Sequence, residues 1–295
     1  MMARDAPPVS PALGLAVAVG AVSTSAILVR WSQAPSLIKA FYRVLFTTML
    51  LVPLALSGHR TAFSRLTGRD VLGAGLAGLA LALHFAAWFE SLEWTSVAAS
   101  VTLVQSQPLF VALGAALLLE ERISVRTTVG ILIALAGMIM MSVGDGGIGG
   151  PTTASVYGNV LAVVGAVMAA GYVLAGRALR HGERIALLPY VTIVYAVCAL
   201  VLLVLLRIEQ LPLVSYPPRE WLLFLGMAIG PGIFGHTVIN WALAHVESSV
   251  VSVSLLGEPV GSTVLALVLL REFPGVATVV GGTIVLGGIA VTSHQ

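Results

Sequence analysis

The sequence PLFVALGAALLLEERISVRTTVGILIALAG at residues 108–137 returns in altered form at residues 259–288, as PVGSTVLALVLLREFPGVATVVGGTIVLGG. At this offset of 151 residues, 12 of the 30 positions are identical. Leucine and valine coincide often by chance in apolar segments, whereas a proline, a glutamate and two glycines in one order at one spacing do not. These informative matches pair Pro108, Glu121, Gly130 and Gly137 with Pro259, Glu272, Gly281 and Gly288. The second half of the chain therefore repeats the first.

The composition is that of a membrane protein. Hydrophobic residues make up 58% of the 295 residues, charged residues make up 9%, and the mean hydropathy is +1.01. A soluble domain carries about 25% charged residues. A helix needs about 20 apolar residues to cross a bilayer, and ten segments meet this requirement: residues 11–29, 37–57, 70–89, 95–118, 126–143, 154–175, 186–206, 220–244, 249–269 and 276–292. The chain is therefore predicted to be an all-α integral membrane protein with ten transmembrane helices and no soluble domain.

The basic residues predict the orientation of these helices. With the N-terminus in the cytoplasm, the cytoplasmic segments hold nine arginines, and the opposite side holds five basic residues. The positive-inside rule then places both termini in the cytoplasm. The apolar segment after Arg4 lacks the short apolar core and cleavage site of a signal peptide, so we expect it to be retained. Cys198 is the single cysteine and is predicted to pack as a small hydrophobe.

An odd number of helices in each repeat constrains the architecture. After five crossings, the second repeat must enter the membrane upside down relative to the first. Inverted repeats have a pseudo-two-fold axis in the membrane plane and place a substrate site near the midplane, between the copies. The segment GDGGIGGP at residues 144–151 is a turn-rich joint between them.

The fourth and ninth predicted helices each contain a proline near the centre, Pro108 and Pro259. Such a proline interrupts the helical hydrogen bonds, and irregular backbone at membrane depth occurs where it is buried in protein or lines a wet cavity. Gln107 and Glu258 precede the two prolines, and an ionisable group at this depth is costly unless it is neutral, paired or hydrated. The alternatives are that the prolines merely shape the bundle, that Glu258 is a protonated structural carboxyl, and that Gln107 joins two helices. For Glu258 we favour a functional role.

Matching polar pairs lie in the third and eighth predicted helices. His84 and Trp88 are four residues apart, as are His236 and Asn240, so each pair projects from one face of its helix. The eighth helix also contains Pro231 within a glycine-rich stretch, which makes it a hinge candidate. For either histidine alone, a buried structural hydrogen bond is the alternative to a role in binding.

Arg43 lies about two turns inside the second predicted helix. It either snorkels to the nearby surface or contacts an anion at one mouth of a cavity. Glu121 and Glu272 are predicted to have structural roles at helix N-termini. The glycines in register at 130 and 137, and at 281 and 288, are predicted to let the fifth and tenth helices pack closely.

The set of Gln107-Pro108, Glu121, Gly130 and Gly137, followed by Glu258-Pro259, Glu272, Gly281 and Gly288, resembles the EamA domain pair of the drug/metabolite transporter superfamily. The resemblance covers nearly the whole chain, with a first EamA-like repeat at 1–143, a linker at 144–153 and a second repeat at 154–295. The first copy has Gln107 where the second has Glu258, so any function that requires an acid is expected from the second copy. Within the superfamily, the chain is similar to the YddG-like amino-acid exporters.

The resemblance implies a secondary transporter that exports small metabolites by alternating access, and the expected substrates are aromatic or other hydrophobic amino acids. It also implies a central cavity between the first, third, fourth, sixth, eighth and ninth helices, with aromatic walls. The predicted substrate-binding residues are His84, Trp88, Gln107, Tyr172, His236, Asn240, Trp241 and Glu258, and the predicted hinges are Pro108, Pro231 and Pro259. The expected location is the bacterial inner membrane, with the protein acting as a monomer. An exporter of cationic drugs and a non-transporting assembly subunit are the alternatives.

Other classes lack support in the sequence. No HExxH, GxSxG or Asp-rich metal motif is present, so we expect neither enzymatic activity nor a metal or cofactor. Lys39 is the single lysine and lies near a helix end, which does not suit a retinal protein. A net charge of +2 gives no indication of nucleic-acid binding. The expected partners are a small-molecule substrate and the lipid bilayer, and coupling to protons is left open.

Overall fold

Helices form the secondary structure of this computed structural model, which describes residues 10–58, 60–118, 124–144, 153–180, 185–242, 254–255 and 257–293. Within these ranges there is no strand. The first half of the chain contains α1 (Pro11–Ser23), α2 (Ser25–Trp31), α3 (Ser36–Gly58), α4 (Arg60–Phe63), α5 (Gly68–Trp94), α6 (Val97–Val104), α7 (Gln107–Leu118) and α8 (Val125–Gly144). The second half contains α9 (Thr153–Arg180), α10 (Leu187–Ile208), α11 (Pro218–Met227), the π-helix η3 (Ala228–Thr237), α12 (Val238–Ala242), α14 (Gly257–Leu265), the π-helix η4 (Ala266–Leu270) and α15 (Val276–Ser293). The prediction of an all-α protein is confirmed for these residues, whereas Glu121 and most of the predicted linker lie outside them.

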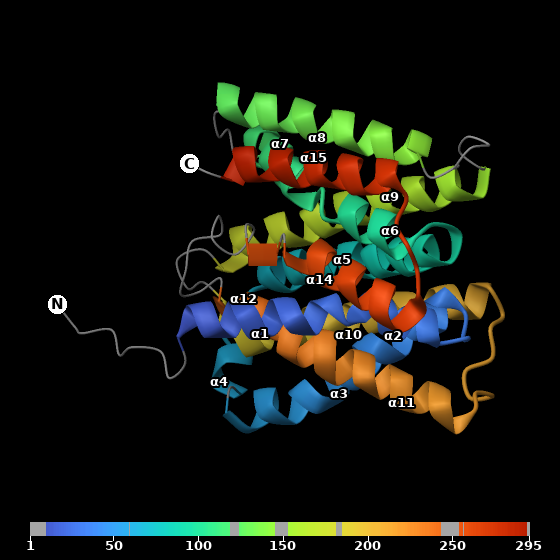
Figure 1. Ribbon diagram of the computed structural model, residues 1–295. Coiled ribbons are helices and arrows are strands. Elements are labelled where there is room, and N and C mark those ends of the chain that lie inside the picture. Colours follow the sequence, from blue (N-terminus) through green and yellow to red (C-terminus); the bar gives the residue numbers. More distant parts are fainter. Residues whose placement is uncertain are drawn as a thin grey trace.

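The lengths of these helices suit a bilayer. Seven helical stretches are long and apolar enough to cross a membrane. Three shorter apolar helices, at Thr128–Gly137, Gly257–Leu270 and Val276–Gly288, lie in the remaining predicted spans. The helices lie roughly along one common direction, and α1 begins at the end of the bundle where α15 ends (Figure 1).

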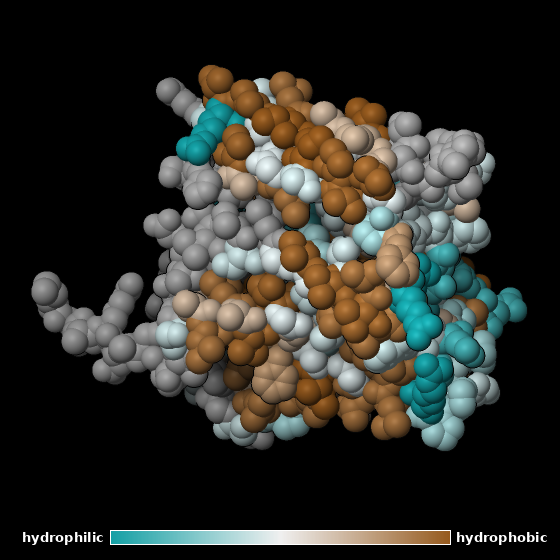
Figure 2. Space-filling model, viewed as in Figure 1, coloured by the Kyte–Doolittle hydropathy of each residue, from teal (hydrophilic) through white to brown (hydrophobic). Residues whose placement is uncertain are grey.

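The outer surface of the bundle is apolar. On α5, the side chains of Leu72, Leu76, Leu79 and Leu83 are all exposed and follow one another at helical spacing. Figure 2 shows hydrophobic side chains over much of the visible face, with hydrophilic residues gathered at the end opposite the start of α1. A contiguous exposed apolar surface of this kind marks a membrane-facing protein.

Local sequence signals set several helix ends. Thr67 caps α5, because its hydroxyl accepts a hydrogen bond from the Asp70 backbone N–H (3.3 Å) and the Asp70 carboxylate accepts one from the Thr67 N–H (2.9 Å). Ser96 caps α6 in the same manner, accepting from the Ala99 N–H at 3.1 Å. These two caps fix the start of the long helix α5 and the tight turn by which the chain re-enters the bundle as α6.

Helices α8 and α15 cross in close contact at the four repeat-matched glycines. A Cβ atom on Gly137 would lie 2.6 Å from the Gly281 carbonyl oxygen, and a Cβ on Gly288 would lie 2.6 Å from the Gly130 carbonyl oxygen. Each glycine of one helix therefore meets the glycine of the other helix, in antiparallel order. The predicted close packing of these helices is confirmed, because a side chain at either position would force the two backbones apart.

Gly288 and Gly287 offer a matched test of this crossing. Alanine at Gly288 would also meet the Ala134 backbone nitrogen at 2.6 Å, whereas nothing lies within 4 Å of a Cβ on Gly287. We expect Gly288→Ala to lower the free energy of unfolding by about 1–3 kcal/mol through overpacking. Gly287→Ala should leave it unchanged or raise it, since alanine is the better helix former by about 1 kcal/mol. Thermal unfolding of both variants in detergent measures the difference, and equal stability would contradict the contact.

Candidate functional site

The fourth predicted helix is broken into two segments. Helix α6 ends at Val104, Gln105 and Ser106 form a turn, and α7 begins at Gln107. Pro108 is thus the second residue of a new helix and not a mid-helix residue, as the sequence had suggested. Proline is well tolerated in a first helical turn because the backbone N–H it lacks has no partner there.

The described part of the ninth predicted helix also has its proline in a first helical turn. Helix α14 begins at Gly257, which places Glu258 and Pro259 in its first turn. The side chain of Glu258 is buried, with 6% of the residue exposed. Each repeat therefore starts a helix inside the bundle, and the free N–H groups of such a start favour negative charge nearby.

Glu258 has one partner that the sequence analysis did not select. Its carboxylate accepts a hydrogen bond from the side-chain amide of Gln105, in the break between α6 and α7. Gln107, which occupies the repeat position of Glu258, is half-buried at the start of α7. The break turns Gln105, and not Gln107, towards the acid of the other repeat.

Arg43 lies in the interior of the bundle. The residue is 2% exposed, so the snorkelling interpretation is wrong. Its Nη1 donates a hydrogen bond to the Ser25 hydroxyl of α2 at 2.7 Å. The guanidinium carbon lies 4.5 Å from the ring centroid of Phe85 and 5.5 Å from that of Phe89, both on α5. These are cation–π contacts, which stabilise a desolvated cation.

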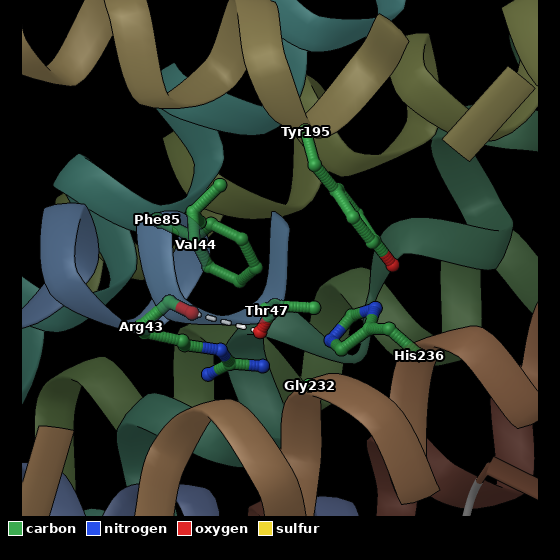
Figure 3. Close-up of a pocket in the computed structure, with 7 residues that line it drawn as sticks. All are labelled: Arg43, Val44, Thr47, Phe85, Tyr195, Gly232 and His236. Carbon is green, nitrogen blue, oxygen red and sulfur yellow. Dashed lines mark hydrogen bonds between the residues drawn. The ribbon is translucent and has the colours of Figure 1, made fainter. Parts of the chain in front are cut away.

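A small pocket adjoins Arg43. Its lining comes from α3, α5, α10 and η3 and consists of Arg43, Val44, Thr47, Phe85, Tyr195, Gly232 and His236. Figure 3 shows the Arg43 guanidinium and the His236 ring on either side of Thr47, with the Tyr195 hydroxyl directed towards His236. The cavity volume is about 10 Å³, which is room for about one water molecule. A metabolite fits here only after the walls move apart.

The wall formed by η3 is the irregular one. This π-helical segment contains Pro231 and two glycines at tight contacts: a Cβ on Gly232 would clash with the Thr47 hydroxyl, and one on Gly235 would clash with Val22. Thr47 Oγ1 lies 2.8 Å from the Arg43 carbonyl oxygen and 3.2 Å from the Ala228 carbonyl oxygen. This hydroxyl links α3 to η3, and π-helical segments are frequent at functional sites.

The structure places His84 and Trp88 against α9. The His84 Nδ1 atom is 2.9 Å from the Gly165 carbonyl oxygen, and the His84 ring stacks on the Trp88 ring with centroids 5.7 Å apart. The same helix presents Phe85 to Arg43 and, edge to face, to His236 at 5.8 Å. His84 and Trp88 thus contact α9, whereas Phe85 of the same helix lines the pocket.

Asn240 and Tyr172 meet between α12 and α9. The Asn240 amide donates to the Tyr172 hydroxyl at 2.9 Å and to the His236 carbonyl oxygen at 2.8 Å. Trp241, the next residue, turns the other way and packs on α1, where a Cβ on Gly14 would lie 2.7 Å from its ring. Of the eight predicted binding residues, His236 lines this pocket, and the other seven are not among its lining residues.

The predicted set lacked the polar site residues Arg43, Thr47, Gln105 and Tyr195, and it also lacked Phe85 of the pocket wall. Arg43 carried a signal, since it is a cation inside an apolar segment. Gln105 and Thr47 are isolated polar residues of a kind common in membrane helices. Tyr195 had no distinguishing signal.

A polar network closes the bundle at the end opposite the start of α1. Arg30 pairs with Glu272 at 3.3 Å, and Glu272 also accepts a hydrogen bond from the Val97 N–H at 2.6 Å. The Lys39 ammonium is 2.6 Å from Glu93. Ser32 and the Gln33 N–H donate to Glu220 at the start of α11. We call Arg30, Lys39, Glu93, Glu220 and Glu272, with their partners, the end network.

Comparisons with known proteins identify the family of this chain and a solved structure with the same fold. The EamA-like transporter family matches the chain twice, over residues 10–143 and 156–294. The chain belongs to the EamA-like transporter family. It is similar to two uncharacterized transporters of Archaeoglobus fulgidus, at 25% identity over 87% of each chain and at 28% identity over 87% of this chain and 94% of the relative. A crystal structure of a protein with 23% identity superposes over 96% of each chain with a TM-score of 0.66, which shows a shared fold.

The family assignment supports the sequence-based expectations at a coarse level. This EamA-like protein is a multi-pass membrane transporter by family, and its relatives carry the same general description. Among the described residues, no group of three or more His, Cys, Asp or Glu side chains is placed to hold a metal ion.

The contact between Gln105 and Glu258 predicts different effects for two neighbouring glutamines. Gln105→Ala removes the hydrogen-bond donor of a buried carboxylate, which should lower the free energy of unfolding by about 1–3 kcal/mol. Gln107→Ala, two residues away, is the matched control and should have a smaller effect. Thermal unfolding in detergent, with and without an added Glu258→Gln change, measures the coupling between the two side chains. A larger loss for Gln107→Ala would show that the contact is wrongly placed.

Proposed function

We propose that this EamA-like protein is a secondary transporter that exports amino acids with aromatic or other hydrophobic side chains by alternating access. The observation that carries the proposal is a buried acid, Glu258, and a buried base, Arg43, in the interior of an apolar bundle among aromatic rings. Charges are costly at membrane depth and mark substrate or ion pathways. An amino acid has both charges next to a side chain that can pack on such rings.

The proposed architecture is ten membrane crossings in two inverted five-helix repeats, 1–143 and 154–295, joined by the linker at 144–153. The contact pattern supports this. The third crossing (α5) packs on the sixth (α9), and the equivalent eighth crossing (η3 and α12) packs on the first (α1). The reciprocal glycine contacts of α8 and α15 have the same two-fold relation. The site then lies between the repeats, as in other inverted-repeat transporters.

Glu258 and the aromatic residues have different proposed roles. Glu258 receives the substrate ammonium or a proton. Phe85 belongs to the wall of the pocket, and Trp88 and Tyr172 extend the aromatic surface behind it. His84, His236, Asn240, Gln107 and Trp241 position these groups or contact the substrate once the cavity opens.

The conformation supports a proposal for the transport cycle. The end network joins α2 to the segment that follows η4 through the Arg30–Glu272 pair, and the pocket beside Arg43 has room for about one water molecule. We take this as a state closed at that end. Opening requires η3 to move from α3, with Pro231, Pro108 and Pro259 as the proposed hinges.

In the orientation favoured by the basic residues, both termini lie in the cytoplasm of a bacterium, and the protein acts as a monomer in the inner membrane.

Two other functions are less well supported. An exporter of cationic drugs would have to accommodate its cargo beside the Arg43 guanidinium, which disfavours a second positive charge. A subunit without transport activity would not require an unpaired buried charge. Neither alternative explains why α3 carries Arg43 at the α5–η3 contact.

Counterflow in liposomes tests the proposed function. Purified protein is reconstituted into vesicles loaded with one unlabelled amino acid, and uptake of the labelled form is followed. A panel with phenylalanine, leucine, aspartate, lysine and a quaternary ammonium drug separates the alternatives. We expect phenylalanine or leucine to accumulate above the level of empty liposomes. Accumulation of the drug alone would favour the drug exporter, and no accumulation of any compound would contradict transport of amino acids.

Glu258→Gln tests whether substrate movement is linked to protonation. This substitution keeps the shape of the side chain and removes its ability to gain or lose a proton. If Glu258 couples the two, counterflow should persist while a pH gradient no longer drives accumulation. Unchanged pH-driven accumulation would show that Glu258 has a structural role and would favour facilitated diffusion.

A further inference from the structure

We propose that Arg43 is the binding site for the substrate carboxylate, and that the protein therefore selects compounds with a free carboxylate over their neutral or cationic analogues. This inference rests on the proposed transport function and deepens it. Its basis is the juxtaposition, inside the bundle, of an incompletely paired guanidinium, a pocket beside it, and an acid held away from it.

The hydrogen bonds of Arg43 are incomplete. Nη1 donates to Ser25, whereas Nη2 is buried and has no hydrogen-bond partner among the described residues. Nη2 belongs to a residue that lines the pocket. A buried donor on a charged group is costly to leave unpaired, and planar guanidinium groups bind carboxylates with two parallel N–H···O bonds. The free donor is the group that a carboxylate would use.

The surroundings hold this cation in place without neutralising it. Phe85 and Phe89 contact the guanidinium and Ser25 fixes one nitrogen, but none of these groups is an anion. Aromatic faces are suited to a desolvated guanidinium, and they also form an apolar surface beside the free donor. An arginine held by such neutral groups can bind an anion.

Glu258 provides the complementary charge at a distance. The two groups interact electrostatically. No ion pair within 4.0 Å joins them in the described part of the chain, where the pairs found are Arg30–Glu272 and Lys39–Glu93. Gln105 holds the Glu258 carboxylate by a hydrogen bond. Two opposite charges held apart in one interior can bind the two ends of a zwitterion, with the carboxylate on Arg43 and the ammonium towards Glu258.

The hinge wall gives the substrate access to Arg43. Gly232 and His236 of η3 form the side of the pocket that faces the guanidinium, and Thr47 links η3 to α3 (Figure 3). Movement of η3 away from α3 breaks the Thr47 hydrogen bond to Ala228 and enlarges the cavity. The Arg43–Ser25 hydrogen bond joins α3 to α2, so this movement does not disturb it. The cation can thus stay in place while access to it changes.

The test compares phenylalanine with phenylalaninamide, which keeps the side chain and the amine but lacks the carboxylate. Counterflow is measured for both compounds with wild type, Arg43→Lys and Arg43→Gln. We expect wild type to prefer phenylalanine by about tenfold or more, the ratio that a hydrogen bond to a charged group provides. Arg43→Gln should abolish the preference, and Arg43→Lys should retain part of it, because lysine keeps the charge without the planar pair of donors.

Arg207→Gln is the matched control, since Arg207 is an exposed arginine in the last turn of α10. It should leave the ratio unchanged. Should Arg43→Gln fail to fold, inhibition of wild type decides the question: 3-phenylpropionate, which has the carboxylate alone, should compete with phenylalanine better than phenethylamine does. Equal transport of acid and amide by wild type, or better competition by the amine, would overturn the assignment of Arg43 while leaving the transport function intact. Failure of wild type to transport either compound or any amino acid would instead contradict the proposed function.

Discussion

The burial of the Arg43 guanidinium constrains the interior of this bundle more than any other feature. A cation that is withdrawn from water loses several kcal/mol of solvation unless other groups replace it. The fold supplies a hydroxyl from α2 and two aromatic faces from α5, and it brings an acid from the other repeat into the same interior. Arg43 thus contacts α2 and α5, and it lines a pocket to which α10 and η3 also contribute.

Irregular backbone is the second theme, and it occurs where the polar groups are. Helices α7 and α14 start inside the bundle, and η3 replaces α-helical turns beside the pocket. Free backbone groups at membrane depth are tolerated where protein or a cavity surrounds them. The break between α6 and α7 also brings Gln105 to Glu258 of the other repeat. The irregular backbone at Gln105 therefore lies where a polar side chain of the first repeat contacts one of the second.

The regular parts of the fold provide the frame for this interior. The α8–α15 crossing is close because glycine faces glycine, so these helices are poor candidates for large relative movement. The end network and the Thr47 hydrogen bond between α3 and η3 are, by contrast, polar contacts that can exchange partners. The described structure thus combines a closely packed helix pair with a pocket wall that hydrogen-bonds to α3 through a side-chain hydroxyl.

The sequence by itself determined the membrane class, the all-helical secondary structure, the family and the close packing of α8 with α15. These follow from hydropathy, from helix length and from residues repeated at one offset, which are local or periodic properties. Tertiary structure decided which side chain in each polar stretch faces the interior. Gln105, and not the predicted site residue Gln107, contacts Glu258 because the helix breaks before Pro108, and a shift of two residues turns a helix face by about 200°. Arg43 could have snorkelled on an isolated helix. Its burial follows from α2, α5 and η3 packing around it, and no single segment of the sequence specifies that arrangement.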